Sequence, residues 1–267
     1  MSVQTLYTAA TGMEALQTKL DVVANNLANV NTIGFKRDRA NFEDLMYRDD
    51  VLPGTLNGGQ PSASGTAVGL GVRVSNVQSD FVQGAFQQTN RALDVAIAGE
   101  GFFQVNDPST GETLYTRAGN FNINANGALV LGSASIGRLL EPQISIPPDA
   151  TNIVVNPDGQ VFTKEPGNAQ LSSQGQIQIV RFINPEGLIK LGDNLYSESD
   201  ASGAGTPGIP GQNGLGELQQ NMLEASNVEP VQELIDLITT QRSFELNSQA
   251  VQAGDQVLQL ISNLRRF

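Results

Sequence analysis

The chain has 267 residues, enough for one large domain or two smaller ones, and its 15 Lys and Arg against 27 Asp and Glu give a formal net charge of −12. It contains no Cys, His or Trp, which excludes disulfides, thiolate metal sites, the commonest general base and the commonest transition-metal ligand. The acidic balance also disfavours nucleic acid as a partner, because its phosphates would be repelled.

The amino-terminal segment MSVQTLYTAATGMEAL lacks the basic region and the compact apolar region of a secretory signal peptide. No stretch approaches the about 18 continuous apolar residues that a membrane-spanning helix needs. We therefore expect no transmembrane segment, and we expect any export to use a machine that needs no cleaved signal.

The first predicted element is a long helix from about Ser2, a suitable N-cap, to about Asn29. Its apolar residues recur at steps of three and four, which is typical of an amphipathic helix that packs nearly parallel to others. These residues are Val3, Leu6, Ala10, Met13, Leu16, Leu20, Val23 and Leu27. We assign residues 1–30 to this helix.

The end of this helix is unusually rich in amides. Residues 21–37 read DVVANNLANVNTIGFKR, and asparagine is a mediocre helix former because its side chain competes for backbone hydrogen bonds. Two interpretations remain open. The amides either cap a frayed helix end, with Gly34 in a left-handed conformation, or hydrogen-bond neighbouring subunits in a packed helical core.

Residues 31–71 are predicted to form an extended linker and a long arm or hairpin. Within them, residues 46–70 read MYRDDVLPGTLNGGQPSASGTAVGL and are rich in Gly, Pro and Ser. An insertion of this size is uncommon inside a compact domain unless it has a function.

Residues 72–216 are predicted to form a mainly antiparallel β domain. Short alternating runs of Val, Ile, Phe and Thr are separated there by turn residues. Asn126-Gly127 and Asp158-Gly159 are strong hairpin turn pairs.

Several motifs in the β region superficially suggest ligand sites. The Gly-x-Gly of GEGFF leads into another strand, so no helix N-terminus is available for phosphate. NDPSTGET and NPDGQ lack calcium-loop spacing and are predicted to be solvated turns. A glycosidase-like carboxylate pair among Asp94, Glu100, Asp107 and Glu112 is disfavoured, since only 6% of residues are aromatic. We therefore predict no enzyme and no catalytic, cofactor-binding or metal-binding residues.

The carboxyl-terminal segment, residues 217–267, is predicted to be helical, with an interruption near Asn227 and with Pro230 in the first turn of a fresh helix. Its apolar stripe consists of Ala250, Val251, Gly254, Val257, Leu258, Ile261 and Leu264. An uncharged amide stripe consists of Gln249, Gln252, Gln256, Gln259 and Asn263. This amide stripe is either an ordinary solvated face or the lining of a channel that must bind neither apolar nor charged segments of passing chains.

Each terminal helix has more apolar surface than it can bury alone. The simplest arrangement packs the two helices on each other or on copies in neighbouring subunits. We therefore predict an α+β fold, in which long N- and C-terminal helices pack as a coiled-coil-like core and the central domain is mainly antiparallel β.

Three segments, in order, resemble the bacterial flagellar rod and hook family of axial proteins. The first is A-N-N-L-A-N followed by T-x-G-F-K, within residues 24–36. The second is DVAIAGEGFFQV with YTRAGNFNINANGALV, and the third is ASNVEPVQELIDLITTQRSFELNSQAVQAGDQVLQ. Within the family, FKRDRANFEDLMY and the insertion at residues 46–70 are most similar to distal rod subunits.

The resemblance implies a structural subunit of the distal rod, the drive shaft of the bacterial flagellum. Such subunits self-assemble helically into a hollow tube that transmits torque and forms part of the export channel. The implied location is the basal body, where the rod spans the periplasm after type III export without a cleaved signal peptide. The implied partners are copies of itself, a proximal rod protein, the hook protein, the P-ring and L-ring proteins and the flagellar export apparatus.

The predicted assembly interface comprises Asn25, Asn26, Leu27, Asn29, Gly34, Phe35, Lys36, Gln241, Arg242, Glu245 and Asn247. The channel-lining candidates are Gln249, Gln252, Gln256 and Gln259. One alternative is a proximal rod or hook-type subunit of the same family. From other classes, a secreted carbohydrate-binding or enzymatic β domain fits poorly without His, Cys or a signal peptide, and a phage tail or adhesin fibre does not predict paired terminal helices.

Overall fold

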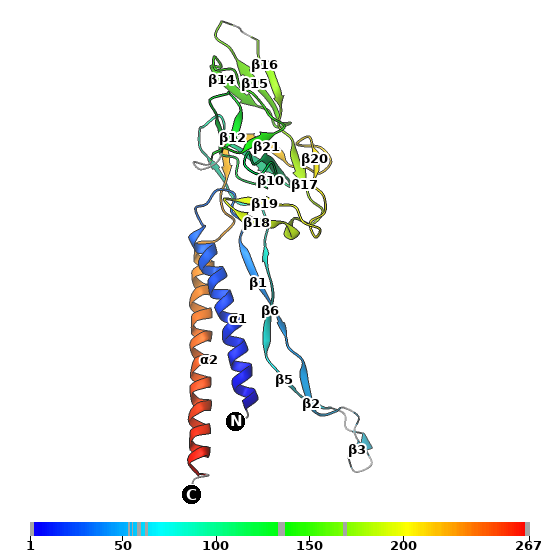
Figure 1. The fold of residues 1–267 in the computed structure, drawn as a ribbon, viewed down its shortest axis with the longest axis vertical. Coiled ribbons are helices and arrows are strands. Elements are labelled where there is room, and N and C mark those ends of the chain that lie inside the picture. Colours follow the sequence, from blue (N-terminus) through cyan, green and yellow to red (C-terminus); the bar gives the residue numbers. More distant parts are fainter. Residues whose placement is uncertain are drawn as a thin grey trace. The chain divides into compact units, whose positions relative to one another are not determined.

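A computed structural model describes residues 3–52, 54, 56–57, 60–61, 64–132, 137–167 and 170–264. The predicted N-cap Ser2 and part of the predicted arm lie outside these residues, as do the side chains of Ile261 and Leu264. The chain divides into two compact units (Figure 1). Unit 1 consists of Met1–Ala28, Asp38–Ser79 and Glu229–Phe267, and unit 2 consists of Asn29–Arg37 and Asp80–Val228.

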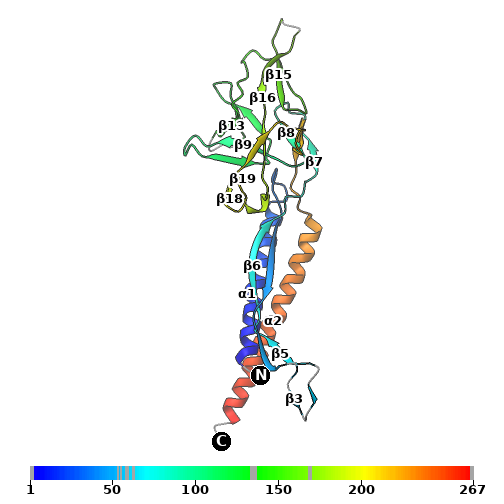
Figure 2. The same cartoon turned by 90° about the vertical axis from the view of Figure 1, so that its right-hand side faces the viewer.

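Unit 1 contains the two helices, α1 (Val3–Ala28) and α2 (Pro230–Leu264). They run side by side and antiparallel in both views (Figures 1 and 2). Small residues allow the close approach, because a Cβ built on Gly254 would lie 2.6 Å from Leu6 Cδ2. Together with the strands described in the next paragraphs, the two helices confirm the predicted α+β class. Coiled-coil packing of the helices stays a prediction.

Unit 1 also contains an antiparallel ribbon formed by residues 38–79. β1 (Asp38–Asp44) pairs with β6 (Val72–Ser79), β2 (Tyr47–Val51) with β5 (Thr66–Gly69), and β3 (Leu56–Asn57) with β4 (Gln60–Pro61). β1 and β6 also contact α1 (Figure 2). Residues 72–79, which the sequence analysis assigned to the β domain, thus belong to the ribbon, because alternation identifies a strand but not its partner.

Apart from one 3-10 turn, the regular elements described in unit 2 are strands joined by loops. They are β7 (Phe86–Gln88), β8 (Val95–Ala98), β9 (Phe102–Asn106), β10 (Thr113–Thr116), β11 (Phe121–Ile123), β12 (Leu129–Leu131), β13 (Leu139–Glu141), β14 (Asn152–Val155), β15 (Gln160–Lys164), β16 (Ser172–Gln176), β17 (Ile179–Arg181), β18 (Ile189–Gly192), β19 (Leu195–Ser197), β20 (Thr206–Gly208), β21 (Glu217–Gln220) and β22 (Met222–Glu224), with a 3-10 turn η1 (Pro185–Gly187). The main sheet has the order β11-β12-β13-β9-β10-β19-β18, with β17 pairing both β9 and β20. β14, β15 and β16 form a second antiparallel sheet.

Both predicted hairpin turns are confirmed. Gly127, between β11 and β12, has φ 80° and donates its N–H to the carbonyl of Asn124 at 3.0 Å. Gly159, between β14 and β15, has φ 85° and donates to Asn156 at 2.9 Å. Positive φ favours glycine at these positions.

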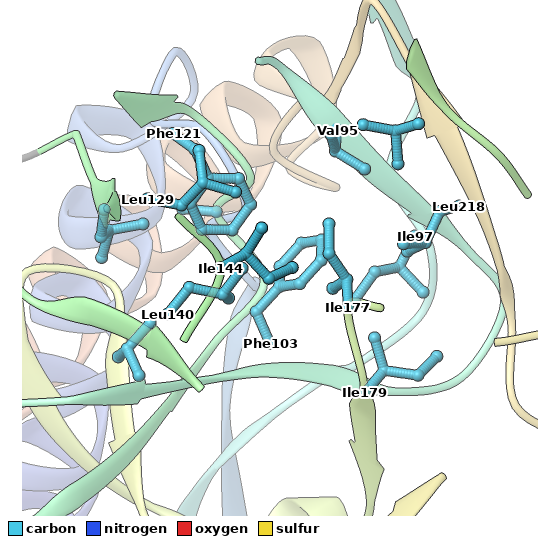
Figure 3. Close-up of a cluster of buried hydrophobic side chains, with 14 of the residues drawn as sticks. Val95, Ile97, Phe103, Phe121, Leu129, Leu140, Ile144, Ile177, Ile179 and Leu218 are labelled. Carbon is cyan, nitrogen blue, oxygen red and sulfur yellow. The ribbon is translucent and has the colours of Figure 1, made fainter. Parts of the chain in front are cut away.

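The core of unit 2 lies between strands that are distant in sequence. Figure 3 shows Phe103, Phe121, Ile144 and Ile177 pointing toward one another, and Phe103 and Phe121 meet edge to face at 5.0 Å between ring centroids. Phe102, the next residue on β9, points to the other face of the strand and packs in a second cluster that includes Phe81, Phe182 and Tyr196. Alternation along the strand predicts that one of the two phenylalanines in GEGFF faces the core and the other the surface. The structure corrects this, because Phe102 is 4% and Phe103 0% exposed, in two separate clusters.

Residues 217–224 form strands rather than the start of the predicted carboxyl-terminal helix. β21 pairs with β8 and β22 pairs with β7, and Leu218 and Leu223 are buried in unit 2. A short apolar run does not distinguish helix from strand by periodicity, and the strand partners lie far away in the sequence. The helix itself begins at Pro230, as predicted.

Candidate assembly site

Asn26, one of the predicted assembly residues, lies at the end of α1 and is only 1% exposed. Its side-chain Nδ2 donates to the carbonyl of Asp38 at 2.9 Å and to Glu233 Oε2 at 3.3 Å, while its Oδ1 accepts the N–H of Asp38 at 2.9 Å. The amide thus joins α1, β1 and the first turn of α2 within unit 1. These three contacts are tertiary contacts within one subunit, so they support neither the capping nor the intersubunit interpretation for Asn26.

The segment from Asn29 to Arg37 turns tightly inside unit 2. Thr32 donates its N–H to the carbonyl of Asn29 at 3.1 Å and its hydroxyl to the Asn29 side chain at 3.0 Å. Gly34 has φ 69°, as the capping interpretation predicted, and donates to the carbonyl of Glu224 at 2.8 Å. A Cβ on Gly34 would lie 2.9 Å from the backbone N of Ala118, so glycine is required by space as well as by φ.

Lys36 lies in the interior of unit 2 and is 0% exposed. Its Nζ donates to Glu224 Oε1 at 2.6 Å and to the carbonyl of Val82 at 2.8 Å. Burial lowers the pKa of Lys36 from its ordinary value of 10.5, opposed by the carboxylate of Glu224 and reinforced by Arg117. With no accessible surface, Lys36 holds its own subunit together and leaves nothing for a neighbouring copy to contact.

Arg117 is the second buried cation of this cluster. Its Nε lies 3.1 Å from Glu224 Oε2, and its Nη1 donates to the carbonyls of Gly99 and Gly101 at 2.9 and 2.6 Å. Gly99 and Gly101 have φ 119° and 138°, which explains the Gly-x-Gly of GEGFF as an arginine-binding turn. Lys36, Arg117 and Glu224 form what we call the buried charge cluster.

Asn227 joins the segments next to this cluster. Its Nδ2 donates to the carbonyls of Asp80 and Val82 at 2.8 and 3.0 Å, and its Oδ1 accepts the N–H of Arg37 at 2.7 Å. Arg117, Glu224 and Asn227 are not among the functional residues predicted from the sequence. The signal was present, because YTRAGNF carries a single Arg and NMLEASNV a single Glu next to apolar residues.

The remaining predicted residues keep accessible surface. Asn25, Gln241, Arg242 and Glu245 are exposed, and Leu27, Asn29, Phe35 and Asn247 are half-buried. Gln249, Gln252, Gln256 and Gln259 are all exposed on α2. Asn247 lies beside Gly12 of α1, and Lys190 Nζ lies 5.5 Å from the ring centroid of Phe35. The structure therefore separates an outer group of predicted residues from the inner three, Asn26, Gly34 and Lys36.

The carboxylates weighed as ligand sites are engaged in local contacts. Asp107 is 7% exposed, not solvated as predicted; hydrogen bonds from Ser109 hold the pKa of its carboxyl below its usual value, and Arg138 lies 3.4 Å away. Asp94 faces Arg91 at 3.6 Å, and Glu100 faces Arg181 at 2.9 Å. Within the described residues, no group of three or more acidic, histidine or cysteine side chains is placed to hold a metal ion. Neither described helix combines the length and apolarity needed to cross a membrane.

Comparison with known proteins identifies the family. Three family models match the chain: a flagella basal body rod protein over residues 6–36, a flagellar hook protein FlgE/F/G D1 domain over residues 96–163, and the carboxyl-terminal region of flagellar basal body rod FlgEFG proteins over residues 219–264.

Full-length relatives agree with these matches. The chain is 45% identical to the flagellar basal-body rod protein FlgG of Caulobacter vibrioides over 98% of its own length and 99% of the relative. It is 42% identical to FlgG of Borreliella burgdorferi over 98% of each chain, and 39% identical to FlgG of Bacillus subtilis over 98% and 99%. The chain therefore belongs to the flagellar rod and hook protein family, as a distal rod protein.

Proposed function

We propose that this chain is a structural subunit, not an enzyme, that assembles helically with copies of itself into the distal rod of the bacterial flagellar basal body. The observation that carries this function is the 45% identity to a flagellar basal-body rod protein over nearly the whole of both chains. The paired helices of unit 1 support it, because they can supply the inner layer of a tube, and unit 2 is a second compact unit with its own core.

The proposal also covers how the rod works mechanically, its part in the export channel and the proteins that it contacts. The assembled tube transmits torque and forms part of the export channel, with a proximal rod protein and the hook protein at its ends. P-ring and L-ring proteins surround it, and the flagellar export apparatus delivers the subunits. The support is the family membership, in which the relatives carry rod and hook names.

The outer predicted residues remain the assembly candidates. Asn25, Gln241, Arg242 and Glu245 are exposed polar side chains on the two helices. Gln249, Gln252, Gln256 and Gln259 line the channel in this proposal, because an uncharged amide surface holds neither apolar nor charged segments of a passing chain.

The function is tested by expressing the chain in a flagellated bacterium whose own distal rod gene is deleted and imaging isolated basal bodies. The expected result is a rod of normal length that contains the chain. Basal bodies that end below the distal rod would refute the function. Deletion of residues 48–66 then separates a distal from a proximal or hook-type subunit, since a distal rod is expected to lose its straightness and stiffness.

The assembly role of Asn25 is tested with a matched pair. Asn25→Ala is expected to change the unfolding free energy of the monomer by less than about 0.5 kcal/mol, because the residue is exposed, and to block rod assembly. Asn26→Ala is expected to lower the unfolding free energy by about 1–3 kcal/mol, because it leaves buried partners unsatisfied. Denaturant unfolding and electron microscopy check the two outcomes. Normal rods from Asn25→Ala would refute its assembly role.

A further inference from the structure

The exposed face of α2 changes character along its length. Near its amino end it carries Val231, Leu234, Ile235 and Ile238, which are 71%, 44%, 49% and 49% exposed. At 3.6 residues per turn, these side chains fall within an arc of about 100°. We call these four residues the aliphatic patch.

The opposite side of α2 is the side that packs within unit 1. Glu233 and Thr240 are 1% and 2% exposed, and Gly254 lies against Leu6 of α1. These positions lie roughly 140° to 200° around the helix from Val231. α1 therefore does not cover the aliphatic patch.

Toward the carboxyl end, the same face of α2 becomes polar. Gln249, Gln252 and Gln256 continue the arc of the patch and are exposed, with Leu246 and Leu260 as single exposed apolar residues. An amide surface is stable in water, whereas a contiguous aliphatic surface is typical of one that another protein covers. A channel lining is also unsuited to aliphatic side chains, because they would bind the apolar segments of passing chains.

We propose that a second copy of this chain covers the aliphatic patch in the assembled rod, through the side of its β1–β6 ribbon that carries Phe42 and Val77. This inference rests on the proposed function, because a helical polymer is built from heterologous contacts in which two different surfaces of identical subunits meet. The aliphatic patch is one such surface. The ribbon supplies the other.

The register of the ribbon places its apolar side chains together. Phe42 pairs with Val74 and Ala40 pairs with Val77, so these residues share one side, on which Phe42 is 39% and Val77 is 49% exposed. The other side of the ribbon carries the exposed ion pair between Arg73 and Glu43, at 2.9 Å. The same register places Asp38 and Asp44 at the two ends of the side that carries Phe42 and Val77. The apolar middle of that side is the part that fits the aliphatic patch.

Thiol accessibility tests the burial of the patch, since the chain contains no cysteine of its own. Ile235→Cys places a thiol in the patch, and Gln252→Cys places a matched thiol on the amide half of the same face. Both are expected to react with a small maleimide in the monomer. In isolated rods, the labelling rate of Ile235→Cys is expected to fall by about tenfold or more, because a covered thiol reacts only when the contact opens. An Ile235→Cys that reacts in rods as fast as in the monomer would overturn the proposal.

The identity of the covering surface is tested by a second thiol on the ribbon. In rods of the double variant Ile235→Cys and Val77→Cys, mild oxidation is expected to give disulfide-linked oligomers, and the monomer is expected to give none. Protection of Ile235→Cys without such oligomers would overturn the assignment to the ribbon.

A third variant separates folding from assembly. Ile235→Asn is expected to melt at the same temperature as the wild-type monomer, because its side chain is already half exposed, and to form no rods; normal rods would contradict the inference. Failure of the wild-type chain to enter basal bodies would instead refute the proposed function itself. Wild-type rods with a reactive Ile235→Cys refute this inference alone.

Discussion

Lys36 and Glu224 are 188 residues apart in the chain, yet their side chains meet at 2.6 Å in the interior of unit 2. Both side chains are 0% exposed, so each charge is held by protein groups and not by water. Lys36 donates two hydrogen bonds, and Arg117 forms a second ion pair with Glu224. These contacts offset the loss of water around the charges. The cluster thereby joins the amide-rich segment to the end of β22.

Removal of this buried cation is expected to destabilise unit 2. Lys36→Met leaves Glu224 with one cation fewer and is expected to lower the unfolding free energy by about 3–5 kcal/mol. Arg73→Met, which removes the exposed pair with Glu43, is the control and is expected to cost less than about 1 kcal/mol. Denaturant unfolding followed by circular dichroism measures both, and equal losses would contradict a structural role for the cluster.

Tyr115 gives unit 2 a pH-dependent stability. Burial, with the nearby carboxylates of Glu198 and Glu141, raises the pKa of Tyr115 from 10.0 to about 12. Between these values the unfolded chain has lost the phenolic proton and the folded chain retains it, so stability is expected to fall as pH rises from about 10 to about 12. Ultraviolet titration should show an ionisation step near pH 12, and Tyr115→Phe should remove this step. If all the tyrosines of the wild-type chain ionised together near their ordinary pKa, the expectation would fail.

At the scale of elements, the turn between α1 and β1 depends on one glycine. Gly34 has φ 69° and no room for a Cβ, whereas Gly111 has φ 72° and nothing within 4 Å of a built Cβ. Alanine at either position is expected to lower the unfolding free energy by about 1–2 kcal/mol, because it disfavours the left-handed conformation. Gly34→Ala is expected to cost more, because the backbone at Arg117 and Ala118 must move.

The two alanine variants form a matched experiment. Their unfolding free energies, measured side by side, give the cost of the clash as the difference between them. Equal losses would show that the turn relaxes without disturbing Arg117. The same difference tests whether Gly34 stabilises the fold of its own subunit, as its contacts with Glu224 and Ala118 indicate.

The carboxyl-terminal elements illustrate a limit of sequence patterns. Leu218 and Met222 are four residues apart, a spacing that suits one face of a helix. In the fold they lie on β21 and β22, whose hydrogen bonds go to β8 and β7. Only partners from a distant part of the chain select the strands.

At the scale of the whole molecule, the two units are interleaved along the sequence. The chain passes from one unit to the other after Ala28, Arg37, Ser79 and Val228. Within unit 1, Asn26 bonds to Asp38 and Glu233. Within unit 2, Asn227 bonds to Arg37 and Asp80. In each unit, one asparagine thus bridges segments that are distant in the sequence, in addition to the packing and ion-pair contacts described above.

Truncation tests where unit 2 ends. A chain that stops after Val228 is expected to keep the cooperative unfolding of unit 2, because it retains β21, β22 and Glu224. A chain that stops after Gly216 is expected to lose it, since Leu218 and Glu224 are 2% and 1% exposed in the fold. Near-ultraviolet circular dichroism of Tyr115 and Tyr196 during heating follows the transition. Identical melting of the two chains would contradict the boundary at Val228.

The sequence by itself determined the elements whose signals are local. Helical spacing predicted α1 and the long part of α2, Asn-Gly and Asp-Gly predicted two hairpins, and the motifs predicted the family. Tertiary structure alone decided that Asn26, Gly34 and Lys36 face inward, that residues 72–79 complete the ribbon, and that residues 217–224 are strands. The physical reason is that burial and pairing depend on partners such as Glu224, Asp38 and β8, which chain folding brings together and which no local pattern specifies.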